Sequence, residues 1–119
     1  INIIYKFDID GINVCHLGDL GHILSEEQAE LLKPVDVLLV PVGGTFTIDY
    51  KGAMQVKESL TPSITIPMHY KTDALRFSLD TVNQFLAQYS KKDNSGKNEI
   101  EITNENLNSY PEIVALNYK

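Results

Sequence analysis

Residues 36–42 read Asp-Val-Leu-Leu-Val-Pro-Val, and this stretch decides the class of fold. A continuous run of leucine and β-branched residues this short is typical of a strand that is buried on both faces, because a helix would need a longer run. Gly43-Gly44 ends the strand. A strand of this kind must be covered by other elements, so the sequence predicts an α/β fold.

Upstream of this strand, the sequence predicts a hairpin and then a helix. The apolar runs Ile3–Phe7 and Ile12–His16 flank residues 8–11, which read Asp-Ile-Asp-Gly. The Asp-Gly pair favours a tight turn between antiparallel strands. Ser25 opens a capping-box pattern, with Gln three residues later, so we expect a helix over Glu26–Leu32.

Downstream, helices and strands alternate. Asp49 can cap a helix in which Ala53, Val56 and Leu60 share one face. The next predicted elements are a strand, a helix, a polar surface loop and two strand-like pieces, at Ser63–Pro67, Leu79–Tyr89, 91–98, Glu99–Thr103 and Ile113–Tyr118. This order predicts one domain over residues 1–119, with a mixed sheet and helices on one of its faces. The other face must be buried by something else.

Composition excludes several classes of function. The 119 residues carry a formal net charge of −6, and no stripe of lysine and arginine suits a nucleic acid. No apolar stretch approaches the roughly 20 residues that span a bilayer, so we expect no membrane partner. Cys15 is the only cysteine, and its place in an apolar strand is typical of a buried thiol in a reducing compartment. We therefore expect a cytoplasmic protein.

The chain starts at Ile1 and enters at once into a strand-like stretch, Ile1–Asp8. We interpret this abrupt start as that of a fragment, because intact domains usually open with a few leader residues. The alternative is a native edge strand after removal of a start methionine.

The three histidines lie in two short segments, and each segment follows an apolar run. His16 and His22 flank Asp19, which sits in a Gly-x-x-Gly bracket, and His69 follows the strand that ends at Pro67. Asp19 and His69 are candidate metal ligands, because carboxylate and imidazole groups at strand ends suit a first-row metal ion. The alternatives are that Asp19 caps a turn and that His69 is a core histidine bonded to a backbone carbonyl.

Other residues near these segments are candidates for supporting roles. His16 and His22 can orient a metal ligand or a water, although His22 could equally be an exposed loop residue. Gly43-Gly44 lies between a strand and a helix, so its amides could face an anion, but adjacent glycines more often mean close backbone packing. The glycine spacing and lysine of a P-loop are missing, and no nucleophile constellation is evident.

Three segments, taken together, resemble a known family. Residues 14–22 read Val-Cys-His-Leu-Gly-Asp-Leu-Gly-His, residues 37–48 read Val-Leu-Leu-Val-Pro-Val-Gly-Gly-Thr-Phe-Thr-Ile, and residues 66–72 read Ile-Pro-Met-His-Tyr-Lys-Thr. In this order they resemble the C-terminal half of small prokaryotic metal-dependent hydrolases of the metallo-β-lactamase fold, over residues 3–86. The resemblance implies half of a four-layer αβ/βα sandwich, with metals at one edge between the halves.

The resemblance also implies roles for individual residues. Asp19 matches the aspartate that bridges two metals when both are bound, and His69 matches the last histidine ligand. Gly43-Gly44 and Thr47 match a stretch that lines the same edge, and Tyr70 is a candidate substrate contact beside His69. The implied cofactor is a divalent metal, zinc first, with manganese, iron or nickel as alternatives. Metal-activated water would hydrolyse a small-molecule ester, lactone, phosphoester or amide.

One part of the family pattern has no counterpart in this chain. The His-x-His-x-Asp-His signature and a further histidine ligand belong to the preceding half of such proteins. With two ligands, the isolated chain is predicted to bind metal weakly or not at all and to be inactive. We expect it to pair with the missing N-terminal half or with a second copy of itself. The alternative hypotheses are a non-catalytic assembly module and a small-molecule binding domain without metal.

Overall fold

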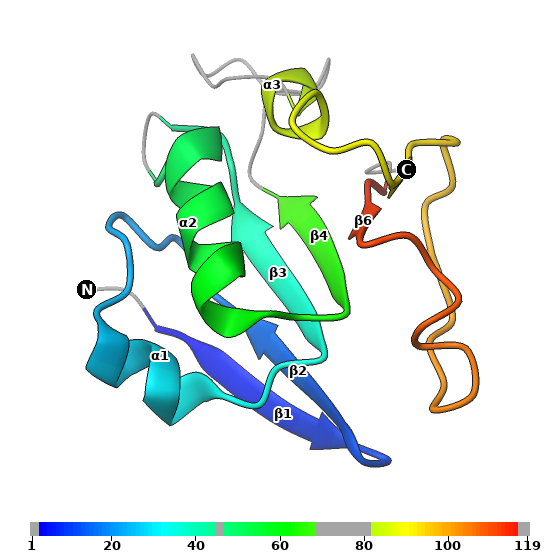
Figure 1. Cartoon of the computed structure of the whole chain (residues 1–119), viewed down its shortest axis with the longest axis horizontal. Coiled ribbons are helices and arrows are strands. Elements are labelled where there is room, and N and C mark those ends of the chain that lie inside the picture. Colours follow the sequence, from blue (N-terminus) through cyan, green and yellow to red (C-terminus); the bar gives the residue numbers. More distant parts are fainter. Residues whose placement is uncertain (1–2, 45–46, 69–81, 117–119) are drawn as a thin grey trace.

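The computed structural model describes residues 3–44, 47–68 and 82–116 of the chain. They form a mixed sheet of six strands in the order β1-β2-β3-β4-β6-β5 (Figure 1). β1 is antiparallel to β2, and the other neighbours are parallel. The strands are β1 Tyr5–Ile9, β2 Ile12–His16, β3 Val37–Pro41, β4 Ile64–Met68, β5 Lys92–Asp93 and β6 Ile113–Val114. The helices are α1 Glu26–Leu32, α2 Tyr50–Leu60 and α3 Asn83–Leu86.

The β1–β2 hairpin confirms the predicted antiparallel pair and shortens its turn. Ile9 pairs with Ile12, so only Asp10 and Gly11 form the connection. Their φ angles are 52° and 83°, both in the left-handed region that a primed two-residue turn requires. Asp-Gly supplies these angles at low cost, which explains why the hairpin was recognisable from the sequence.

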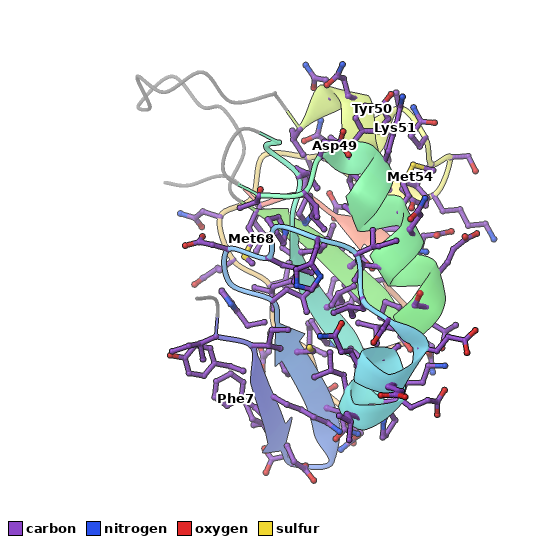
Figure 2. The ribbon with its side chains drawn as sticks, turned by 90° about the vertical axis from the view of Figure 1, so that its left-hand side faces the viewer. Phe7, Asp49, Tyr50, Lys51, Met54 and Met68 are labelled. Atoms are coloured by element: carbon purple, nitrogen blue, oxygen red, sulfur yellow. The ribbon has the colours of Figure 1, made fainter. Side chains whose placement is uncertain are left out.

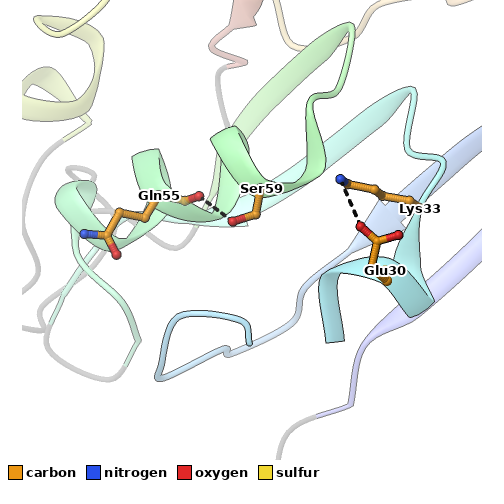
Figure 3. Close-up of polar contacts among 4 residues, drawn as sticks. All are labelled: Glu30, Lys33, Gln55 and Ser59. Atoms are coloured by element: carbon orange, nitrogen blue, oxygen red, sulfur yellow. Dashed lines mark hydrogen bonds and ion pairs between the residues drawn. The ribbon is translucent and has the colours of Figure 1, made fainter. Parts of the chain in front are cut away.

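The first two helices begin where their capping residues predict. The Ser25 hydroxyl accepts a hydrogen bond from the Gln28 N–H, and the Gln28 side chain accepts one from the Ser25 N–H. Asp49 caps α2 by accepting from the Gly52 N–H at 3.0 Å. The exposed sides of these helices carry local polar contacts, such as the 3.4 Å ion pair between Glu30 and Lys33 (Figure 3). Figure 3 also shows the Ser59 hydroxyl donating to the Gln55 carbonyl, at 3.1 Å.

All three helices pack on the same face of the sheet. The core on this face combines Cys15, Leu38 and Val40 from the strands with buried side chains of the helices: Ala29, Ala53, Val56, Leu60, Phe85 and Leu86. β3 lies in the middle of the sheet, and four of its five residues are buried. The prediction of a central strand buried on both faces is therefore confirmed.

The other face of the sheet carries a second, smaller core. Its buried members are strand residues: Ile12, Val37, Ile64, Ile66 and Val114. Residues 98–110, which have no strand in them, cover one part of this face through partly buried side chains: Ile100, Ile102, Leu107 and Tyr110. The rest of the face, on β1, remains exposed.

Three sequence predictions near the C-terminus differ from the structure. Glu99–Thr103 forms no strand, because Ile100 and Ile102 alternate with polar residues to pack on the sheet rather than to pair with a neighbour. The strand beside β6 is instead Lys92–Asp93, inside the predicted surface loop 91–98, and the Ala115 N–H donates to the Asp93 carbonyl at 2.8 Å. The predicted helix Leu79–Tyr89 is confirmed only as α3, because residues 87–89 are not helical, and residues 79–81 lie outside the described ranges.

No helix in the described ranges is long and apolar enough to cross a membrane.

Candidate metal centre

Asp19 lies on a short turn that follows β2. Leu17 continues the sheet by donating its N–H to the Leu39 carbonyl at 3.1 Å, and the chain then leaves the sheet at Gly18. Gly18 has a φ of 61°, in the left-handed region where a side chain is disfavoured. The leucines on both sides of the turn, Leu17 and Leu20, are 0% and 2% exposed, whereas Asp19 is exposed. The core therefore anchors both ends of a turn whose carboxylate faces outward.

The two glycines of the bracket around Asp19 do different things. Gly18 supplies the positive φ of the turn. Gly21 has no such angle, and a Cβ placed on it would have no neighbour within 4 Å. The sequence pattern therefore pointed to the correct turn, but only the first glycine is required for it.

A backbone contact joins the Asp19 turn to the segment that precedes α2. The Ile48 N–H donates to the Leu20 carbonyl at 2.8 Å, and Gly43 forms an isolated antiparallel bridge with Asp49. Gly43 is buried, and Gly44 follows with a φ of 88°. Gly43 thus lies at a backbone bridge to the start of α2, and an anion facing these amides stays a prediction.

Thr47 belongs to the same segment. It is half-buried, and its hydroxyl donates to the Ile48 carbonyl at 3.1 Å. The structure thus brings the Gly43-Gly44 segment and Thr47 to the edge of the sheet that carries Asp19.

His16 is the last residue of β2 and is half-buried. Its Nδ1 atom accepts a hydrogen bond from the Gly18 N–H at 3.1 Å. An imidazole nitrogen that accepts carries no proton, so this contact assigns the tautomer with the proton on Nε2. The ring also meets the ring of Tyr5 edge-on, with 6.5 Å between centroids.

His22 has the opposite arrangement. It is exposed, and its Nδ1 atom lies 2.8 Å from the Ile23 carbonyl oxygen. A carbonyl oxygen can only accept, so Nδ1 carries the proton and the neutral ring presents the lone pair of Nε2. Hence the two histidines on either side of Asp19 offer different groups: an N–H donor from His16 and a nitrogen acceptor from His22.

The second predicted ligand, His69, and its neighbour Tyr70 lie outside the described residues. The strand that leads to them is well defined, since Pro67 is buried and the Val42 N–H donates to the Met68 carbonyl at 3.0 Å. β2, β3 and β4 are parallel, so β2, which ends at His16, and β4, whose last described residue is Met68, point to the same edge of the sheet (Figure 2 labels Met68). Ligands of open α/β sheets bind at this carboxyl edge.

The donor set at this edge fits a divalent metal only in part. The exposed Asp19 carboxylate is a suitable oxygen ligand, and an imidazole at position 69 would add nitrogen. Within the described ranges, no group of three or more His, Cys, Asp or Glu side chains could hold a metal ion. A complete site therefore needs donors besides those that the structure places.

Cys15 lies one residue before His16 but on the helix-covered side of the sheet. It is fully buried, and this burial raises the pKa of its thiol to about 11. A thiol with such a pKa is neutral at physiological pH and is a poor nucleophile. The prediction of a buried, inert thiol is confirmed.

Sequence reasoning missed the contacts that anchor the Asp19 turn. Leu17 and Leu20 look like ordinary apolar residues of a loop, and nothing in the sequence links Leu20 to Ile48. The only available signal was that both leucines are apolar although they surround an exposed carboxylate.

Comparison with known proteins adds independent evidence. The family described as the β-lactamase superfamily domain matches residues 1–69. A UPF0173 metal-dependent hydrolase of Carboxydothermus hydrogenoformans is 40% identical over 68 residues, which cover 57% of this chain and 30% of that protein. Another, from Pyrococcus furiosus, is 42% identical over 69 residues, which cover 57% of this chain and 31% of that protein.

Solved structures agree with these matches. A Thermotoga maritima protein, assigned to the metallo-β-lactamase superfamily with a suggested Zn-dependent hydrolase activity, superposes with a TM-score of 0.81 and 41% identity. The superposition covers 96% of this chain and 57% of that protein. A metallo hydrolase of Ignicoccus hospitalis superposes with a TM-score of 0.54 and 31% identity, over 66% of this chain and 34% of that protein. The chain thus spans about a third of the curated relatives, adopts part of the metallo-β-lactamase fold, and belongs to the β-lactamase superfamily domain family.

Proposed function

We propose that this chain supplies one part of the active site of a metal-dependent hydrolase, with Asp19 and His69 as metal ligands. The observation that carries the proposal is the exposed position of Asp19 on an anchored turn. Its carboxylate is exposed on a turn that Leu17 and Leu20 anchor in the core, at the edge where β4 leads to His69. Because the core anchors both ends of this turn, the carboxylate is held in a fixed position at the edge of the sheet, as a metal ligand requires.

Zinc is the metal that we propose first, since carboxylate and imidazole are among its usual ligands and the Thermotoga neighbour is described as Zn-dependent. Manganese, iron and nickel accept similar donors and are the alternatives. A bound divalent ion supplies Lewis acidity and lowers the pKa of a coordinated water. Ester, lactone, phosphoester and amide bonds are the classes of small-molecule substrate that this chemistry can hydrolyse.

The neighbouring residues would then bind and orient the substrate. The Nε2–H of His16 can donate to a substrate oxygen, while Nε2 of His22 can accept a proton. The backbone at Gly43-Gly44, together with Thr47, lines the same edge, and we place Tyr70 beside His69 as a further contact. These groups fit a small polar substrate that approaches the edge of the sheet.

We further propose that the remaining ligands come from a complementary N-terminal half. The chain covers 30% of the Carboxydothermus relative, so most of that fold lies outside the matched segment. The face opposite the helices has an exposed apolar row, in which Tyr5, Phe7 and Ile9 are 50%, 47% and 55% exposed. Figure 2 shows Phe7 on the side of the sheet away from α2, the helix that carries Met54. Such a row suits burial against a second sheet.

A second copy of the chain could bury the same row, and this would make the chain a non-catalytic assembly module. The exposed row on β1 is the observation that favours this alternative. Sedimentation separates the two possibilities, because a homodimer forms from the chain alone whereas the hydrolase needs a different polypeptide. As the location we propose the cytoplasm, because the free thiol of Cys15 suits a reducing compartment.

An NMR-monitored zinc titration tests the ligand assignment, because it detects the weak binding expected of an incomplete site. We expect saturable shifts at residues 18–20 that Asp19→Asn and His69→Ala abolish. Asp10→Asn is the matched control, because Asp10 lies at the opposite end of β2 and Asn tolerates its φ of 52°. Shifts that persist in Asp19→Asn, or that vanish equally in Asp10→Asn, would contradict the assignment. Mass spectrometry of native material would show whether a second polypeptide accompanies the chain.

A further inference from the structure

We propose that His16 is a positioning residue for Asp19. The imidazole ring of His16 stabilises the turn that carries Asp19 by accepting a hydrogen bond at Nδ1, which it can do only in the tautomer with the proton on Nε2. The proposal deepens the proposed function and rests on Asp19 being a metal ligand. It assigns to His16 a task in the backbone, in addition to any contact with substrate.

The hydrogen bond determines the protonation of the ring. The Gly18 N–H can only donate, so the Nδ1 atom at 3.1 Å must accept. A doubly protonated imidazolium has two donors and no acceptor, and the other neutral tautomer carries its proton on Nδ1. Only one of the three forms of the side chain is therefore compatible with this turn.

The turn requires a partner at this point. The Leu17 N–H is still paired across the sheet, with the Leu39 carbonyl, and the Gly18 amide is the first group after the strand. Gly18 is half-buried and turns the chain with its φ of 61°. A partly buried N–H without an acceptor is destabilising, so the contact with His16 stabilises this conformation over others. Asp19 is the next residue, and the direction of its carboxylate depends on that conformation.

The ring that accepts this bond is held by the sheet and not by the loop. His16 pairs with Tyr5 of β1 on one side and with Leu39 of β3 on the other. The Tyr5 ring meets the imidazole edge-on at an interplanar angle of 74°. Since β2 lies between two strands, the backbone that carries the imidazole is paired on both sides. Through this hydrogen bond, His16 ties Gly18, the residue before Asp19, to the paired strands of the sheet.

The first test measures the tautomer in the unmodified chain. Nitrogen-15 NMR of the imidazole distinguishes a protonated from an unprotonated ring nitrogen. We expect His16 to be unprotonated at Nδ1 at neutral pH and His22 to serve as the internal comparison, with its proton on Nδ1. A proton on Nδ1 of His16 would overturn the proposal without the use of any variant.

The second test compares two amides at position 16. His16→Asn places an acceptor oxygen near the position of Nδ1, whereas His16→Gln places it near the position of Nε2. We expect the Gly18 amide to exchange with solvent about fivefold to tenfold faster in His16→Gln, as the loss of one hydrogen bond predicts, and within about twofold of the parent rate in His16→Asn. The zinc-induced shifts at residues 18–20 should likewise be reduced in His16→Gln and remain close to those of the parent in His16→Asn. Equal effects of both amides would refute the proposal.

The two readouts separate the failure of this proposal from the failure of the proposed function. Amide exchange and the tautomer are measured without metal. If the Gly18 amide still exchanges slowly in His16→Asn, but the zinc-induced shifts are unchanged in Asp19→Asn, the positioning of the turn is supported and the assignment of Asp19 as a metal ligand is wrong. If zinc binding depends on Asp19 but not on the choice of amide at position 16, the positioning role is wrong.

Discussion

The two glycines around Asp19 allow a paired substitution with effects of opposite sign. In Gly18→Ala, the alanine backbone must adopt a φ of 61°. The Cβ atom makes this left-handed conformation unfavourable by about 1–2 kcal/mol. Alanine also lowers the conformational entropy of the unfolded chain, which stabilises the fold by about 0.4–1 kcal/mol. We therefore expect the free energy of unfolding to fall by about 1 kcal/mol in total. In Gly21→Ala the second effect acts without strain, because the Cβ meets nothing within 4 Å. We expect that variant to gain up to about 1 kcal/mol.

These free energies convert into shifts that a melting experiment resolves. The entropy of unfolding is about 2.1 cal/mol/K per residue, or about 0.25 kcal/mol/K for 119 residues. One kcal/mol then corresponds to about 4 °C, so Gly18→Ala should lower Tm by about 4 °C and Gly21→Ala should raise it by a few degrees. Differential scanning calorimetry measures Tm, and urea titration gives the free energy of unfolding. Shifts of the same sign in both variants would refute the assignment of the turn to Gly18.

Two further substitutions test other features of the fold. The Thr65 hydroxyl is fully buried and has no hydrogen-bond partner among the described residues. Thr65→Val should therefore raise the free energy of unfolding by about 1 kcal/mol, as measured by urea titration. A decrease in this free energy would mean that the hydroxyl is hydrogen-bonded in solution. Hydrogen bonds from Lys97 and Ser95 lower the pKa of Asp93 to about 2. Its contribution to stability is complete above the unfolded pKa of about 4 and disappears as pH falls towards 2. Asp93→Asn should therefore lose less stability than the parent between pH 5 and pH 2, as urea titrations at both pH values would show, and an identical loss would contradict this role.

Elements that depend on a few neighbouring residues were predictable. Ser25 and Asp49 begin their helices through hydrogen bonds to amides three residues away, and Asp10-Gly11 forms its turn through its own dihedral angles. These interactions lie within one turn of chain, so the relevant chemistry is visible in the sequence. The same holds for the central strand, whose continuous apolar run already indicates burial on both faces.

Elements that depend on distant partners were predicted poorly. The alternation of Ile100 and Ile102 indicates that one side of the segment is buried, but it does not say whether that side pairs in a sheet or lies across one. Lys92–Asp93 contains no apolar residue, and it forms a strand only because β6 lies beside it. Lys92 adds contacts that no local pattern reveals, since its ammonium donates to the Leu86 and Tyr89 carbonyls at 3.0 and 2.8 Å.

The candidate site divides in the same way. Motif order was enough to single out Asp19 and to relate the chain to its family, because residue type and spacing are properties of the sequence. The sequence could not distinguish the roles of His16 and His22, which are the same residue type at similar distances from Asp19. Folding makes them different, since one ring accepts from the Gly18 amide while the other donates to its neighbour's carbonyl. The protonation of an imidazole depends on its hydrogen-bond partner. Both partners lie within two residues in the sequence, but only the folded backbone decides which group each ring meets, because His16 is fixed in β2 between β1 and β3 and Gly18 then turns the chain with a φ of 61°.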